Sequence, residues 1–178
     1  AHGVDVFVGA YEQVRVHSFV PPDRIGNSEE VPLAGNVGGR SGETYSQYEI
    51  MREALDFIRA HRDEPFFCYL PITPPHGMYD IPADDPAWEL YEDADWIADA
   101  PKEAANYAAM VSLLDRNVGE VLDLLRELGL EEDTIVFFTG DNGGQDRFRT
   151  KDHPRGYFGP NVDPRTGAAF RGGKGDLY

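Results

Sequence analysis

The chain has 178 residues, enough for one domain with a sizeable core, and 41% of them are apolar. Its net charge of −16, from 32 acidic and 16 basic residues, argues against nucleic-acid binding, which requires neutralising phosphates. The sequence contains no run of 18 apolar residues and no basic and apolar leader, so it predicts neither a membrane span nor a signal peptide.

The first 45 residues are rich in glycine, proline and asparagine and show little helical or strand periodicity. They predict a loop-rich opening segment over residues 1–45, with a short strand at residues 4–8. His17 lies in this segment. A lone histidine in a loop is interpreted as solvated rather than catalytic.

Residues 46–144 predict an αβαβ core. A first helix begins where Ser46 and Glu49 match a capping box, in which each side chain binds a free backbone amide of the other. A second helix, over residues 102–128, presents one apolar face and ends at Gly129. Helices alternating with apolar strands indicate an α/β fold with at least part of the sheet parallel.

The strand between these helices is predicted at residues 65–70, where the run PFFCYL suits burial on both faces. Cys68 within it is interpreted as a small buried hydrophobe, because nothing nearby would lower the pKa of its thiol. His76 follows two prolines at the end of this strand, and a rigid functional site and a surface loop both stay open for it. The stretch 84–103 carries eight acidic residues and predicts a solvated acidic loop.

The run TIVFFTGDNGG at residues 134–144 predicts a second buried strand that ends in a polar loop. Asp141 and Asn142 are adjacent oxygen donors at the carboxyl end of this strand, where α/β sheets bind ligands. Aspartate, asparagine and glycine also favour plain turns. On this stretch alone, a turn and a cation site both stay open.

Residues 145–178 predict an active-site loop and tail. Glycines flank Lys174 and let the backbone approach a ligand, so the lysine is able to hold an oxyanion as a point charge. The pattern is not a phosphate-binding P-loop, because Gly175 follows the lysine and too few residues remain for a helix. A flexible glycine-rich terminus is the plain alternative.

Three motifs, at residues 65–76, 134–143 and 170–178, occur in that order as PFFCYLPITPPH, TIVFFTGDNG and FRGGKGDLY. Each resembles a segment of the type I sulfatases, the arylsulfatase-like branch of the alkaline phosphatase superfamily. The runs at residues 3–9 and 114–119 resemble that family too, so the resemblance covers nearly the whole chain. It implies a mixed, largely parallel sheet flanked by helices, as in alkaline phosphatase.

The resemblance implies a role for four residues. Asp141 and Asn142 match the pair that ligates a divalent cation, Ca²⁺ or Mg²⁺. His76 matches the catalytic histidine that contacts the sulfate ester near the leaving oxygen. Lys174 matches a lysine that binds the sulfate, and it counts with His76 as a catalytic and substrate-binding residue.

The family's nucleophile, a formylglycine made within a Cys/Ser-x-Pro-x-Arg motif, has no counterpart here. Its upstream aspartate pair and Lys-x-His are also missing. The resemblance implies that residues 1–178 are the central part of a single sulfatase catalytic domain, an internal fragment without the formylglycine motif and the C-terminal part. We expect this chain alone to be inactive and the full enzyme to be secreted or periplasmic.

Two alternatives stay open. One is a phosphodiesterase or phosphonate hydrolase of the same superfamily, and the other is a non-catalytic homologue that binds sulfate or a glycan. The sequence does not indicate whether the substrate is an aryl sulfate or a sulfated glycan, nor the oligomeric state.

Overall fold

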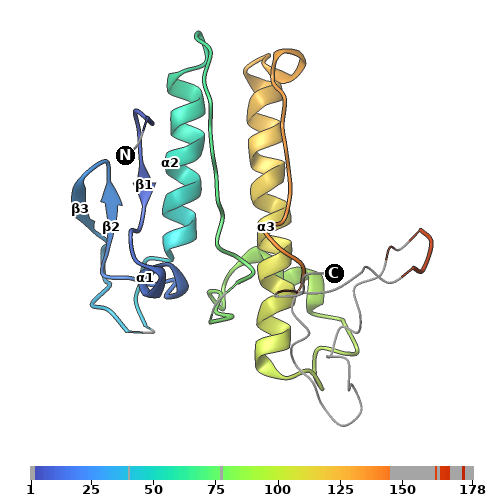
Figure 1. The fold of residues 1–178 in the computed structure, drawn as a ribbon. Coiled ribbons are helices and arrows are strands. Elements are labelled where there is room, and N and C mark those ends of the chain that lie inside the picture. Colours follow the sequence, from blue (N-terminus) through green and yellow to red (C-terminus); the bar gives the residue numbers. More distant parts are fainter. Residues whose placement is uncertain are drawn as a thin grey trace. The chain divides into compact units, whose positions relative to one another are not determined.

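A computed structural model describes residues 3–39, 41–76, 78–144, 163, 165–168 and 174 (Figure 1). The chain forms two compact units. The first comprises Ala1–Asp93 and Asn106–Thr134, and the second comprises Ala94–Ala105 and Ile135–Tyr178. In the described ranges no helix is both long and apolar enough to cross a membrane.

The first unit opens with a small antiparallel sheet in the order β1-β2-β3. Its strands are β1 (Val8–Gly9), β2 (Asp23–Gly26) and β3 (Glu29–Pro32), with the short helix α1 (Gln13–His17) after β1. Residues 1–45 are therefore more regular than the loop-rich segment expected from their composition. Asn27 explains the difference, because it turns the β2–β3 hairpin at a φ of 56° and its side chain accepts a hydrogen bond of 2.9 Å from the Phe7 amide.

The helix α2 (Ser46–Ala60) packs beside β1 (Figure 1). The predicted capping box is wrong, because the helix begins one residue earlier than the box requires. Tyr45 is the N-cap and gives no side-chain cap, and the Ser46 amide donates instead to the Phe19 carbonyl at 2.8 Å. Glu49 pairs with Arg52 at 2.8 Å.

The helix α3 (Lys102–Glu127) confirms the second predicted helix. Gly129 lies just after it at a φ of 71°, a conformation in which a side chain is strained. The next amide, of Leu130, donates back to the Leu125 carbonyl at 2.8 Å. This is the bond pattern of a glycine-terminated helix, so the predicted helix end is confirmed.

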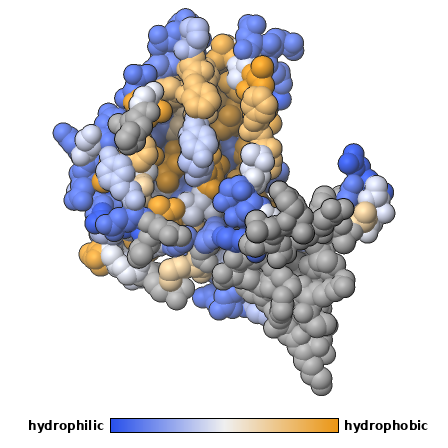
Figure 2. Space-filling view, viewed as in Figure 1, coloured by the Kyte–Doolittle hydropathy of each residue, from blue (hydrophilic) through white to orange (hydrophobic). Residues whose placement is uncertain are grey.

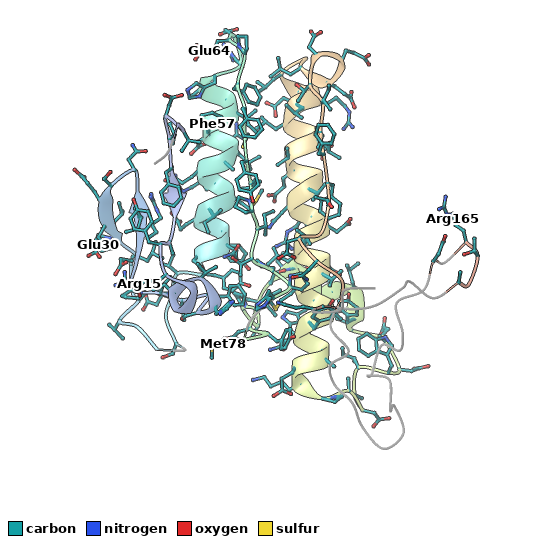
Figure 3. All side chains as sticks on the ribbon, viewed as in Figure 1. Arg15, Glu30, Phe57, Glu64, Met78 and Arg165 are labelled. Atoms are coloured by element: carbon teal, nitrogen blue, oxygen red, sulfur yellow. The ribbon has the colours of Figure 1, made fainter. Side chains whose placement is uncertain are left out.

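Two apolar clusters hold the first unit together. One joins the opening segment, the stretch before α3 and the N-terminal half of α3, and its buried members are Phe19, Tyr45, Ile81, Ala87, Ala109, Met110 and Leu113. The other joins the C-terminal ends of α2 and α3 through Ile58, Leu124 and Leu125, with Phe57 at its edge (Figure 3). Each predicted helix therefore buries part of its apolar face, although Val111 and Leu122 of the predicted α3 face are exposed.

The two predicted strands are not paired within the part of the chain that the structure describes, where the only ladders are those of β1, β2 and β3. Phe67 is 80% exposed and Phe137 is 88% exposed, so burial on both faces is wrong for these segments here. Apolar side chains accordingly appear on the surface in Figure 2. A strand is buried on both faces only when other layers of the fold cover both sides of its sheet. The parallel sheet stays a prediction.

Candidate functional site

His76 belongs to the first unit and follows the buried Pro74 and a cis bond between Pro74 and Pro75. Its backbone amide donates to the Thr73 carbonyl at 2.9 Å, which closes a tight turn. The His76 side chain is exposed. The prolines fix the backbone before His76 as expected, but the strand expected at residues 65–70 is not formed in the described chain, and a functional role for His76 stays a prediction.

His17 stacks on His76, a contact that the sequence does not predict. The ring centroids are 4.6 Å apart and the ring planes differ by 11°. His17 is half-buried at the end of α1, so its interpretation as a solvated loop histidine is wrong. The only sequence signal was its place two residues before Phe19, which is part of the core.

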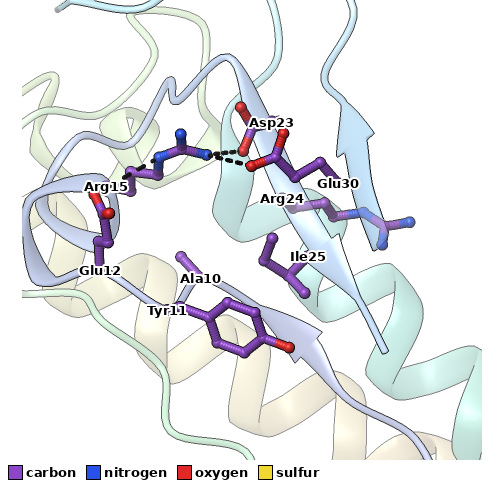
Figure 4. A pocket seen from close by; sticks show the side chains of 8 residues that line it. All are labelled: Ala10, Tyr11, Glu12, Arg15, Asp23, Arg24, Ile25 and Glu30. Carbon is purple, nitrogen blue, oxygen red and sulfur yellow. Dashed lines mark hydrogen bonds and ion pairs between the residues drawn. The ribbon is translucent and has the colours of Figure 1, made fainter. Parts of the chain in front are cut away.

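A shallow pocket beside α1 is lined largely by charged side chains that pair with one another (Figure 4). Arg15 of α1 binds Asp23 of β2 and lies 3.9 Å from Glu30 of β3 and 4.0 Å from Glu12. Arg24 of β2 forms an ion pair with Glu53 of α2 at 2.7 Å. These pairs tie α1 to the hairpin and fix the helix that carries His17.

Asp141 and Asn142 belong to the second unit and are both exposed. The Asn142 side-chain amide donates to the Gly143 carbonyl at 3.0 Å, which directs its nitrogen to the backbone and leaves its oxygen for another partner. A carboxylate and an amide oxygen are donors that suit Ca²⁺. No group of three or more candidate metal ligands occurs among the described residues, so these two would form part of a larger shell.

Lys174 is also in the second unit, and its backbone amide donates to the Gly144 carbonyl at 2.9 Å. This bond brings the lysine's backbone to the loop that carries Asp141 and Asn142, although thirty residues separate Lys174 from Gly144. The bond joins the backbone of Lys174 to that loop. That the side chains of Asp141, Asn142, Lys174 and His76 face one site stays a prediction.

The predicted acidic loop contains a buried charge that sequence reasoning did not find. Asp85 is fully buried and accepts two hydrogen bonds from Arg116 of α3, at 2.9 and 2.8 Å. It also accepts from the Tyr48 hydroxyl of α2 and from the Ala87 amide at 2.7 Å, where it caps the 3-10 helix η1 (Pro86–Tyr91). Asp85 thus joins three elements of the first unit.

Ionisation in this cluster follows from its contacts. Burial alone would raise the pKa of Asp85, but the hydrogen bonds from Arg116, Tyr48 and the Ala87 amide outweigh it and hold that pKa below its ordinary value. Burial, reinforced by the hydrogen bond to Asp85, raises the pKa of Tyr48. Burial also raises the pKa of the Cys68 thiol, which agrees with an unreactive cysteine.

Comparison with known proteins gives the family. The family model described as Sulfatase matches residues 4–176, so the chain belongs to the sulfatase family. It is 33% identical over 117 residues to N-acetylgalactosamine-6-sulfatase of Rattus norvegicus, covering 65% of this chain and 19% of that protein. It is 29% identical over 143 residues to the uncharacterized sulfatase YdeN of Escherichia coli, covering 79% of this chain and 23% of that protein.

A third relative, an endo-4-O-sulfatase of Bacteroides thetaiotaomicron, is 32% identical over 93 residues, which cover 45% of this chain and 18% of that protein. The chain thus matches about a fifth of the length of these curated relatives.

Proposed function

We propose that the whole protein hydrolyses sulfate esters, with a sugar sulfate as its substrate. The observation that carries the proposal is the bond between the Lys174 amide and the Gly144 carbonyl, in a chain matched by the sulfatase family over residues 4–176. This bond supports the proposal because it joins the backbone of a cationic residue to the loop that carries Asp141 and Asn142. The sugar is suggested by the relative named N-acetylgalactosamine-6-sulfatase.

Charge compensation is the main task of such a site. A sulfate ester carries a negative charge, and a chain with a net charge of −16 repels it except where the local potential is positive. The Lys174 ammonium supplies one positive group for the sulfuryl oxygens. Asp141 and Asn142 would hold a Ca²⁺ or Mg²⁺ ion, which would supply further positive charge to those oxygens.

The leaving alcohol needs a proton when its bond to sulfur breaks. His76 is suited to supply it, because an imidazole titrates near neutral pH and this one is exposed on a tight turn. The nucleophile is proposed to be a formylglycine outside this chain. We also propose that the whole protein is secreted or periplasmic.

The test compares hydrolysis of 4-nitrophenyl sulfate and 4-nitrophenyl phosphate by the whole protein. We expect the sulfate to be preferred, and the Lys174→Ala variant to lose about 10- to 100-fold in kcat/KM because a charged hydrogen bond to the substrate is lost. Lys102→Ala, which changes an exposed lysine of the same unit, should have little effect.

Two outcomes would contradict the proposal. Preference for the phosphate would indicate the phosphodiesterase or phosphonate hydrolase alternative. Saturable binding of a sulfated sugar without turnover would indicate the non-catalytic homologue.

A further inference from the structure

His17 and His76 come from distant parts of the sequence and meet face to face. His17 ends α1, whereas His76 follows the proline turn, and their nearly parallel rings lie 4.6 Å apart between centroids. Both residues belong to the first unit. Nothing in the resemblance assigns His17 a role, and the proposed function does not use it.

Both rings are carried by well-anchored backbone. On the His17 side, Arg15 binds Asp23 of the hairpin, the Ser18 hydroxyl donates to the Gly39 carbonyl at 2.9 Å, and Phe19 is buried in the core. On the His76 side, the amide is held by Thr73 and the preceding Pro74 is buried. The stack therefore joins two fixed points rather than two loose loops.

A shared metal ion does not explain the pair. Imidazole nitrogens bind a metal in the plane of the ring, and two stacked, nearly parallel rings do not aim at a common ion. In the described residues neither histidine belongs to a group of three or more candidate ligands. The stacking contact uses the faces of the two rings, whereas a metal ion would bind at a ring nitrogen.

We propose that His17 is a positioning residue for His76, whose ring plane it fixes by covering one face. Stacking against a half-buried ring restricts the rotamers open to an exposed histidine on a turn. With the plane fixed, the nitrogen edge of His76 keeps one orientation toward the sulfate ester. This inference rests on the proposed role of His76.

The experiment uses the whole protein with His17→Ala, which removes the stacked ring, and His17→Phe, which keeps an aromatic face and lacks the nitrogens. Two quantities are measured: kcat for 4-nitrophenyl sulfate, and the rate at which diethyl pyrocarbonate modifies His76, located by peptide mass spectrometry. His61→Ala is the matched control, since His61 stacks on Phe57 at 4.2 Å instead.

We expect His17→Ala to lower kcat about 3- to 10-fold and to speed modification of His76 by a similar factor, because the His76 ring is no longer held in one orientation. His17→Phe should restore both quantities to within about 3-fold of the unsubstituted protein, and His61→Ala should change neither.

Three results bear on the inference. An unchanged modification rate in His17→Ala overturns it, whether or not the protein turns over sulfate. A His17→Phe variant as impaired as His17→Ala also overturns it, because the nitrogens and not the ring face would then matter. Absence of turnover by the unsubstituted protein counts against the proposed function instead, and the modification rates then still decide whether His17 covers His76.

Discussion

Asp141→Ala is expected to lower kcat for sulfate ester hydrolysis by about 10³-fold, because the cation it would help to hold supplies several kcal/mol of charge stabilisation in the transition state. Asp141 is the only charged donor of the pair that it forms with Asn142, so its loss weakens cation binding more than loss of the amide would. The measurement is kcat for 4-nitrophenyl sulfate across a Ca²⁺ titration of the whole protein.

Two variants make this result specific. Asp141→Asn keeps an oxygen donor without the full charge, so we expect activity to return at higher Ca²⁺ concentration. Asp99→Asn changes an exposed carboxylate of the same unit and should leave the Ca²⁺ dependence unaltered. Full activity of Asp141→Ala without added Ca²⁺ would show that Asp141 is not a cation ligand.

Asp85→Asn is expected to lower the free energy of unfolding by about 3 kcal/mol, as when one partner of a buried ion pair is removed. The lower end of the usual range applies, because the Arg116 side chain is 32% exposed and water would partly solvate it. The neighbouring Asp84 is exposed, so Asp84→Asn should change stability by less than about 0.5 kcal/mol. Urea denaturation of both variants checks this, and equal effects would contradict the buried-pair account.

The same aspartate predicts how stability depends on pH. Its pKa is lowered in the folded state, so the stability it contributes is complete above the unfolded pKa of about 4 and is lost as pH falls through the lower folded pKa. We expect the unfolding midpoint of Asp85→Asn to fall less steeply with acidification than that of the unsubstituted protein. Parallel curves for the two proteins between pH 5 and 2 would contradict the assignment.

The helices were predictable because their signals are local. The apolar face of α3 and its terminal Gly129 act within a few residues of sequence, and both agree with the structure. The start of α2 was not predictable to the residue, because the Phe19 carbonyl, supplied from outside the helix, binds the Ser46 amide. The hairpin was missed because its strands are short, and asparagine and glycine suit loops as well as turns.

The residues around the candidate site also divide into features set by nearby sequence and features set by long-range packing. The Asp141–Asn142 pair is contiguous in sequence and was visible there, as was the proline turn before His76. The His17–His76 stack and the Asp85–Arg116 pair depend on long-range packing. An acidic run gives no sign of which carboxylate is buried, because that is decided by an arginine from another element.

The central claim is that His76, Asp141, Asn142 and Lys174 serve one sulfate-binding site. Crystals of the whole protein grown with Ca²⁺ and soaked with inorganic sulfate test it most directly, through the anomalous signal of the calcium. The account predicts one calcium bound by oxygens of Asp141 and Asn142, with a sulfate beside it that contacts both His76 and Lys174. A calcium site elsewhere, or His76 and Lys174 on separate surfaces, would contradict it.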